Sequence, residues 1–317
     1  MQWEIIATKG ASTVIVLAFF ALIVFFLRFL YGPKGKFRDP VWDKWNEEAR
    51  LQLEKEVDGK ADKRLKKAFL DYADTFRTGE AAEDNPLAVK VEHSLRVLAI
   101  AEEIAASEPA FAEHNKGRAL RLSALFHDVG RFEQYSRYKT FIDSQSCNHG
   151  AFGARVLRRQ GFLRNETRQM QSAVLSAVAI HNRLHEPKGY SKDVLDVLRA
   201  LKDADKLDIL RVLAETLTPG AKRDEVVLLH LKEEEGRYSA AVLQALEEDR
   251  VALYADMRYV NDFRILLCTW VSDMHYDTTR RILKREGHLP PILAGLANIP
   301  EVQEKARNKV EQHLEPF

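Results

Sequence analysis

The stretch "LRLSALFHDVGRFEQ", Leu120 to Gln134, contains the feature that decides how this chain folds. Its apolar residues recur at helical spacing as far as Phe126, and then His127 and Asp128 stand where the pattern calls for another aliphatic side chain. An isolated buried carboxylate is strongly unfavourable unless a cation or strong hydrogen bonds compensate its charge. Either this helix end is solvated, or a positive group lies beside it.

The composition is that of a folded protein with one large or two modest domains. Of the 317 residues, 46% are hydrophobic and 30% are charged, and the formal net charge is +1. This balance gives no sign of a nucleic-acid surface, and the local basic cluster from Arg155 to Arg159 is typical of a solvated helix face. Cys147 and Cys268 are too few for a disulfide framework or a thiolate zinc site.

The amino-terminal region predicts a membrane anchor. Gly10 to Leu27, "GASTVIVLAFFALIVFFL", is a run of 18 residues without a charge, and Trp3 and Tyr31 flank it as interfacial aromatic residues do. A cleavable signal peptide would have a shorter apolar region and a small-x-small cleavage site, whereas "RFLYGPKGKFR" follows here. Basic residues between Arg28 and Arg38 follow the span, so we expect one transmembrane helix with the body of the protein in the cytoplasm.

The remaining chain divides into a linker and a helical domain. We assign 1–38 to the anchor and its juxtamembrane hinge, 39–82 to a charged amphipathic helical linker, and 83–317 to an all-α domain. The linker could be a stalk, a dimer contact or the first helix of the domain. Breakers in "RTGEAAEDNP" place the next helix start near Leu87, and "DEVVLLHL" (Asp224–Leu231) stays unassigned.

Several ionisable residues interrupt the apolar stripes of separate predicted helices and therefore point into the domain interior. These are His93, His127, Asp128, His149, His181 and Asp205. The ordinary explanation for a single histidine on an apolar face is a core residue with one or two hydrogen bonds, and His275 also lies on such a stripe. The two aspartates are harder to explain in that way, because buried carboxylates need partners more than neutral imidazoles do. The joint occurrence favours a metal site.

The other histidines occupy weaker contexts, and we expect solvent or ordinary core positions for them, with His185 the one that could belong to the site. They are His114, His185, His230, His288 and His313.

The ordered set of a lone histidine, an adjacent His-Asp, further histidines and a late aspartate resembles the HD superfamily of metal-dependent phosphohydrolases. The resemblance covers about Val89 to Val212. "FHDVGRFEQ" is similar to the signature segment and "KDADKLDIL" to the closing-aspartate segment. "FIDSQSCNHGAFGARVL" and "AIHN" are similar to the regions that supply extra histidines in members with two metals.

The resemblance implies an HD-type helical bundle that binds one or two divalent metal ions. His93, His127, Asp128 and Asp205 would bind the first ion, and His149 and His181 would complete the second, with Asp128 bridging. Mixed imidazole and carboxylate ligands suit Mn²⁺, Fe²⁺, Zn²⁺ or Ni²⁺, and Mg²⁺ stays open. His127 and Asp128 would then hold a metal-activated water for attack on a phosphate ester.

Basic residues near the His-Asp pair could stabilise the reacting phosphoryl group. Arg131 lies one turn beyond the pair and is the first candidate, and Arg137 and Lys139 follow it. For the general acid that protonates the leaving group, His185 and Asp208 are candidates by their proximity to ligand segments alone.

The sequence thus predicts a membrane-anchored phosphohydrolase, a phosphomonoesterase or phosphodiesterase, acting on a nucleotide or another phosphorylated small molecule. A catalytically silent nucleotide- and metal-binding sensor at the membrane is the alternative, and a structural adaptor built on the linker is a third class. The substrate, the oligomeric state, including a homo-oligomer, and the role of residues 213–317 stay open.

Overall fold

A computed structural model describes residues 62–218, 220, 228 and 231–316 of the chain. The chain divides into two compact units, Met1–Arg64 and Leu65–Phe317, and the fold reported below is that of the second unit. The predicted transmembrane run Gly10–Leu27 lies outside the described residues, as does most of the unassigned stretch Asp224–Leu231. None of the described helices has the length and apolar character needed to cross a bilayer.

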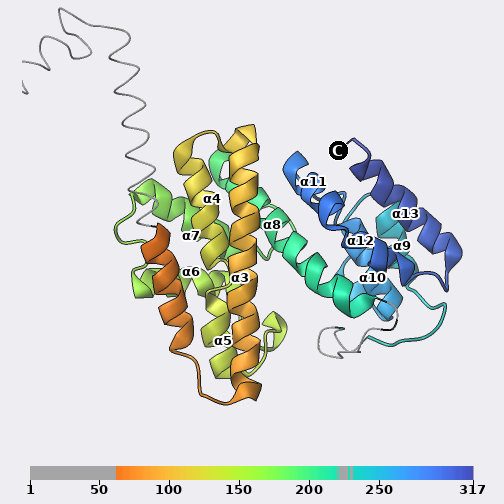
Figure 1. Cartoon of the computed structure of the whole chain (residues 1–317), viewed down its shortest axis with the longest axis horizontal. Helices are drawn as coiled ribbons and strands as arrows, with labels where there is room; N and C mark the ends of the chain where they lie inside the picture. The colour runs from red at the N-terminus through yellow and green to blue at the C-terminus, as the bar shows by residue number, and fades with distance from the viewer. Residues whose placement is uncertain (1–61, 219, 221–227, 229–230, 317) are drawn as a thin grey trace, which may run out of the picture. The chain divides into compact units, whose positions relative to one another are not determined.

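The described residues are helical apart from their connections and one isolated parallel β-bridge between Lys232 and Tyr259, so the predicted all-α fold is confirmed for this part of the chain (Figure 1). Residues 62–74 form the first described helix. The α-helices that follow are α3 (Ala81–Ser107), α4 (His114–Phe126), α5 (Gly130–Tyr138), α6 (His149–Gln160), α7 (Arg168–Ile180), α8 (Lys192–Leu217), α9 (Ala240–Glu247), α10 (Val260–Thr269), α11 (Asp277–Glu286), α12 (Leu289–Ala294) and α13 (Pro300–Leu314). Short 3-10 helices are η1 (Pro109–Phe111), η2 (Asp143–Gln145) and η3 (Tyr254–Asp256).

One hydrophobic core lies among residues 62–74, α3 to α7 and the first half of α8. At one side of this core Phe69 packs edge-on against Phe126 and Phe132, with ring centroids 6.0 and 5.7 Å apart. Phe126 immediately precedes the His-Asp pair, and Phe132 follows it by one turn. The aromatic packing therefore fixes the backbone on both sides of the pair.

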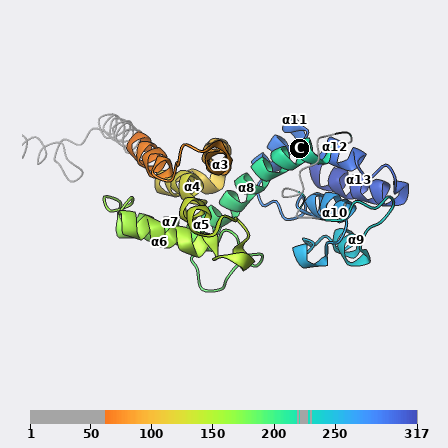
Figure 2. The ribbon, with the colours of Figure 1, turned by 90° about the horizontal axis from the view of Figure 1, so that it is seen from below.

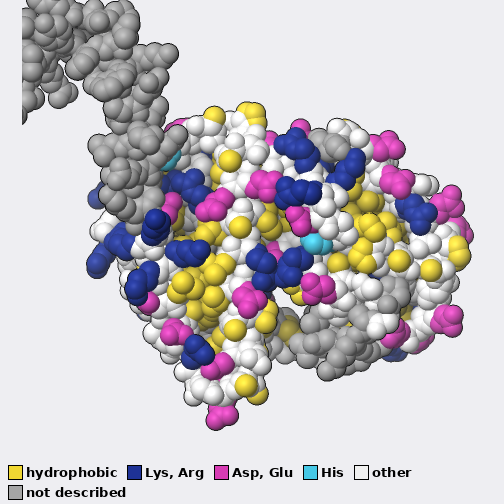
Figure 3. Space-filling model, viewed as in Figure 1, with side chains coloured by type: hydrophobic (Ala, Val, Ile, Leu, Met, Phe, Trp, Pro, Cys, Tyr) yellow, Lys and Arg dark blue, Asp and Glu magenta, His cyan; other side chains and the backbone are white. Residues whose placement is uncertain are grey.

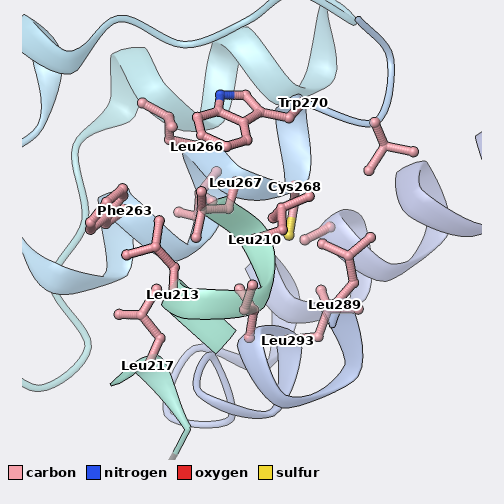
Figure 4. Packing of buried hydrophobic residues seen from close by; sticks show 14 of the residues in the cluster. Leu210, Leu213, Leu217, Phe263, Leu266, Leu267, Cys268, Trp270, Leu289 and Leu293 are labelled. Carbon is pink, nitrogen blue, oxygen red and sulfur yellow. The ribbon is translucent and has the colours of Figure 1, made fainter. Parts of the chain in front are cut away.

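A second core lies among the second half of α8 and helices α9 to α13. Leu210, Leu213 and Leu217 of α8 face Leu267 of α10 and Leu293 of α12 there (Figure 4). This core is built from the carboxy-terminal residues for which the sequence indicated no role.

Helix α8 belongs to both cores (Figures 1 and 2). Its Leu201 and Ala204 are buried in the first core, and its Leu207 and Leu210 are buried in the second. Asp205 lies between these two sets, so a predicted metal ligand stands at the point where the helix passes from one core to the other.

Helix α3 begins earlier than the sequence indicated. It starts at Ala81 rather than near Leu87, and Pro86 lies inside it. The Asp84 carboxylate accepts hydrogen bonds from the Thr78 and Gly79 amides at 2.8 and 3.1 Å, which fixes the turn that leads into the helix. Pro86 lies in the second turn of α3, where it has no amide to donate to the Ala82 carbonyl.

The compact unit also reaches further toward the amino terminus than the predicted domain boundary at residue 83. Leu65, Phe69 and Ala73 are buried in the first core, although they belong to the segment 39–82 that we predicted as a linker. On the face drawn in Figure 3, basic and acidic side chains lie interspersed, in keeping with the net charge of +1.

Candidate metal centre

The first half of the centre joins three helices. His93 lies in the middle of α3, and His127 follows the last residue of α4 as its C-cap. Their Nε2 atoms are 3.1 Å apart, and Oδ1 of Asp205 from α8 lies 3.1 Å from His93 Nε2 and 3.7 Å from His127 Nε2. These three residues can offer one ligand atom each to a single metal ion.

The second half joins the start of one helix to the end of another. His149 is the first residue of α6, and His181 is the C-cap of α7. Their Nε2 atoms are 3.1 Å apart as well. Gly150, which follows His149 directly, allows α6 to approach the end of α7.

Asp128 lies between the two histidine pairs and presents one oxygen to each. Its Oδ2 is 3.8 Å from Nε2 of both His93 and His127, whereas its Oδ1 is 3.5 Å from Nε2 of His149 and 4.0 Å from Nε2 of His181. The structure therefore brings all six sequence-predicted residues together. The position of Asp128 is that of a carboxylate able to bridge two ions.

Every histidine of the centre is oriented by a hydrogen bond from its other ring nitrogen. His127 Nδ1 bonds the Ala124 carbonyl and His181 Nδ1 bonds the Val178 carbonyl, both at 2.8 Å. These are carbonyls at helix carboxyl ends, which lack intrahelical partners. The Nδ1 atoms therefore donate, and the Nε2 lone pairs face the centre.

Carboxylates orient the other two histidines. His93 Nδ1 lies 2.7 Å from Asp208 Oδ2, and His149 Nδ1 lies 2.7 Å from Asp143 Oδ2. Such partners of the outer ring nitrogen are typical of metal-binding histidines, because they fix the tautomer and raise the basicity of the ligand nitrogen.

Two glycines allow helices α5, α6 and α7 to approach closely enough for the ligand side chains to meet. A Cβ atom on Gly130 would lie 2.7 Å from the His149 carbonyl oxygen, so only glycine allows the start of α5 to reach α6. A Cβ atom on Gly150 would lie 2.8 Å from the Val178 carbonyl oxygen at the end of α7. The first contact places Asp128 beside His149, and the second places His149 beside His181.

The carboxylates of the centre are held in their charged form. Burial alone would raise the pKa of Asp128, but the positive charge of Lys90, followed by the neighbouring imidazoles and Arg131, holds it well below its usual range. Lys90 Nζ lies 2.9 Å from Asp128 Oδ2. Burial opposes the ionisation of Asp205 too, and its imidazole neighbours, His93 first, hold its pKa below the ordinary value.

The imidazoles differ in their protonation. Burial lowers the pKa of His127, and burial followed by the charge of His149 lowers that of His181 to about 3. For His93 burial acts in the same direction, but Asp205 and Asp208 outweigh it and raise the pKa to about 9. A metal ion at the first half of the centre would take the place of that proton.

The residues present fit a divalent metal ion. Oδ1 of Asp205 is buried, and although His93 Nε2 lies 3.1 Å away, no described group donates to this oxygen with hydrogen-bond geometry. A buried carboxylate oxygen without a donor is unfavourable unless a cation completes its surroundings. Four imidazole nitrogens and the oxygens of two carboxylates suit Mn²⁺, Fe²⁺, Zn²⁺ or Ni²⁺.

Most residues of the centre line a pocket of about 400 Å³ within the described unit. Lys90, Arg131, Arg183, Lys202 and Lys206 bring positive charge to it. Apolar and aromatic residues of α8 and the carboxy-terminal region also line it: Ile209, Val251, Ala252, Leu253, Tyr254 and Trp270.

Of the basic residues that the sequence indicated for stabilising a phosphoryl group, Arg131 lies at the pocket. Arg131 lines the pocket, but its guanidinium donates to Asp128, Gln134, Asp143 and the Phe141 carbonyl, so it supports the carboxylates of the centre.

The two further basic candidates lie elsewhere, which corrects their predicted proximity to the reacting phosphate. Arg137 pairs with the buried Glu133, and Lys139 pairs with Glu83 at 3.0 Å. Neither residue lines the pocket.

The two candidates for the general acid do not suit that role. Asp208 is tied to His93, Arg96 and Arg211, and although burial opposes its ionisation these partners hold its pKa below the ordinary value. His185 is exposed and does not line the pocket. His275 pairs with Asp203 at 3.2 Å, away from the centre, as expected for an ordinary stripe histidine.

Sequence reasoning missed the outer residues of the centre. Asp143 accepts from His149, Gln134 and Asn182, and Lys90 lies one turn before His93 on α3. Lys90 could have been found from its spacing to His93. Asp143 gave no such signal, because it lies in a short 3-10 helix outside any apolar stripe.

Comparison with known families agrees with this geometry. Residues 91–210 match the family model of the HD domain, and this segment runs from Val91 in α3 to Leu210 in α8. It includes His93, the His-Asp pair and Asp205. The match of this segment to the HD domain is consistent with the HD superfamily of phosphohydrolases. Comparisons with curated proteins and with solved structures gave no match.

Proposed function

We propose that this protein is a metal-dependent phosphohydrolase that acts on a nucleotide or another phosphorylated small molecule. We further propose that Gly10–Leu27 anchors it in a membrane with the hydrolase domain on the cytoplasmic side. The observation that carries the enzymatic proposal is the Asp128 carboxylate flanked by two histidine pairs whose free nitrogens face it. HD domains bind divalent metals for phosphate chemistry, and the match over residues 91–210 supports the same use here.

Divalent ions bound at this centre would supply Lewis-acid charge and an activated water. The protein's own residues prepare the site for a phosphate ester. His93 and His127 hold one side of the centre, and His149 and His181 hold the other. Lys90 lines the pocket beside Asp128 and brings positive charge to the place where a phosphoryl group would lie.

Metal dependence is the first test. The purified protein should hydrolyse nucleotides or generic phosphate esters, lose this activity on chelation, and regain it with Mn²⁺ or a similar ion. His127→Ala and Asp128→Ala should each lower kcat/KM by more than about 100-fold, since removal of a ligand costs at least as much as removal of its hydrogen-bond partner. His275→Gln is the matched control, because His275 lies on an apolar stripe outside the pocket. Full activity of either alanine variant would refute the assignment.

The same preparation separates the alternatives. A sensor would bind metal and nucleotide in stoichiometric amounts and release no product over hours. An adaptor would contain no metal, which elemental analysis of freshly purified protein would detect.

The anchor has its own test. The full chain should sediment with membranes and resist extraction by alkaline carbonate, and deletion of 10–27 should release it into the supernatant. Release of the intact chain by carbonate would argue against a spanning helix.

A further inference from the structure

The pocket has a wall that the metal centre does not use. Ile209 of α8 and Val251, Leu253 and Tyr254 before and within η3 line it, and none of them belongs to the segment that carries the HD motifs except Ile209. Leu253 is 42% exposed and Tyr254 is 53% exposed, although both are large hydrophobic residues. Because they face a pocket, a bound molecule can cover them.

The lysines and arginines that line the pocket carry more positive charge than the carboxylates of the metal centre neutralise. Lys206 pairs with Asp273, and Lys90 pairs with Asp128. Among the described residues no carboxylate forms an ion pair with Lys202, whose ammonium donates only to the Leu184 carbonyl at 3.4 Å. Burial and then the neighbouring Lys206 lower the pKa of Lys202, so an anion beside it would stabilise its charged form.

Helix α8 places both Lys202 and part of the apolar wall next to the metal centre. Lys202, Asp205, Lys206 and Ile209 have the spacing of one helix face, and all of them line the pocket. Lys202 therefore lies about one turn from Asp205 on one side, and Ile209 lies about one turn away on the other. Exposed Arg183, which follows His181 closely, adds a second cation to this pocket.

We propose that the carboxy-terminal region is the substrate-recognition part of the molecule and that its substrate is a nucleotide with more than one phosphate group. The base lies against Tyr254 and Leu253, and a phosphate other than the one at the metal centre binds Lys202 and Arg183. This inference rests on the proposed function, since it places the reacting phosphate at the metal centre. Aromatic side chains bind bases by stacking, and lysine and arginine bind phosphate oxygens. The pocket volume of about 400 Å³ falls within the range for such ligands.

Two variants of the full chain test the proposal in Mn²⁺. Tyr254→Ala should raise KM for nucleoside triphosphates by about 5- to 100-fold with kcat little changed, which corresponds to the loss of one stacked base. The same variant should leave KM for inorganic tripolyphosphate, which has no base, unchanged. Lys202→Gln should raise KM for nucleoside triphosphates by about tenfold or more and affect nucleoside monophosphates far less.

Matched controls are available on exposed surfaces. Tyr138 is 47% exposed and lies outside the pocket, so Tyr138→Ala should leave both KM values unchanged. Lys188 is exposed and lies outside the pocket, so Lys188→Gln serves in the same way. The inference is overturned if Tyr254→Ala and Lys202→Gln behave like these controls.

A binding measurement separates this inference from the proposed function. If the wild-type protein turns over no phosphate ester, the proposed function fails, and calorimetric titration with a nucleoside triphosphate still decides the inference. A dissociation constant that rises in Tyr254→Ala and in Lys202→Gln, but not in their controls, supports it. Equal constants in all variants, or no binding by the wild type, overturn it.

Discussion

At the scale of single residues, the centre depends on side chains that do not face the metal position themselves. Asp208 is the clearest case, because its carboxylate accepts from His93 Nδ1 and is held in place by Arg96 and Arg211. Without it the His93 ring would lose both its orientation and the negative charge behind it.

We therefore predict that Asp208→Asn weakens divalent-metal binding by about 10- to 100-fold. Competition with a chromogenic chelator measures this change. Asp196→Asn is the matched control, because Asp196 is a buried aspartate of the same helix whose partners are lysines outside the pocket. Equal metal affinity of the two variants would show that Asp208 does not position His93.

The limits of sequence reasoning are visible at this scale. The residues of the centre could be found because imidazoles and carboxylates interrupted apolar stripes. Asp208 lies in the same segment as Asp205, yet the sequence indicates it only as a candidate general acid, since its partner His93 is 115 residues away. Such a role depends on the contact between α3 and α8, which no local pattern contains.

At the scale of elements, two contacts in which a glycine approaches the backbone of a neighbouring helix set the geometry of the centre. Gly130 at the start of α5 approaches the backbone of α6, and Gly150 in α6 approaches the backbone of α7. A methyl group at either place would separate helices that carry metal-ligand candidates.

Gly130→Ala should therefore destabilise the fold by about 1 to 3 kcal/mol, the usual effect of forcing an extra methyl group into a packed site, and should also weaken metal binding. Urea unfolding and chelator competition measure the two effects. Gly117→Ala is the control in α4, because a Cβ atom there would meet its nearest atom at 3.4 Å. It should be neutral or stabilising, as alanine favours helices. Similar losses in both variants would contradict the role of the close approach.

The contact between α4 and α8 predicts a dependence on pH. Lys116 of α4 lies 2.9 Å from the Asp196 carboxylate of α8, and Lys192 lies 2.8 Å from it. Burial opposes the ionisation of Asp196, but the two lysines lower its pKa below the ordinary value of 3.8. The carboxylate thus stabilises the fold above its unfolded pKa, and this contribution is lost as the pH falls through the lower, folded value.

Asp196→Asn should cost about 1 to 3 kcal/mol of unfolding free energy at pH 7. Its deficit relative to the wild type should stay constant down to about pH 5 and shrink only below about pH 4. Urea unfolding at a series of pH values provides the measurement. A deficit that stays unchanged at the lowest pH would exclude the charge of Asp196 as its cause.

At the scale of the whole molecule, the structure adds residues before the predicted domain start to its first core. Phe69 is completely buried against Phe126 and Phe132, which lie on either side of the His-Asp pair in the sequence.

We predict that Phe69→Ala lowers the unfolding free energy by about 3 to 5 kcal/mol. Leu70→Ala, next to it and 37% exposed, should change it by less than about 0.5 kcal/mol. Equal effects in thermal or urea unfolding would exclude residues 62–74 from the folded unit.

The helical class and the segment of the centre could be predicted because they depend on local periodicity. The domain start could not, because charged residues such as Lys66 and Lys67 surround Leu65 and Phe69 and make the helix resemble a solvated linker. The contribution of the carboxy-terminal region to the pocket could not be predicted from the sequence either. Tyr254 enters the pocket only because α8 belongs to both cores, and this is a property of the tertiary packing.

The way in which the histidines are oriented has a consequence for mutational tolerance. Each pair has one imidazole fixed by a main-chain carbonyl, His127 or His181, and one fixed by an aspartate, His93 or His149. No point substitution deletes a carbonyl, so the first type of support persists through sequence drift. The second type disappears with a single codon change. In proteins that diverge from this sequence, we therefore expect the metal-binding orientation of the histidines on α3 and α6 to be lost first. The orientation of the histidines at the ends of α4 and α7 should persist longer.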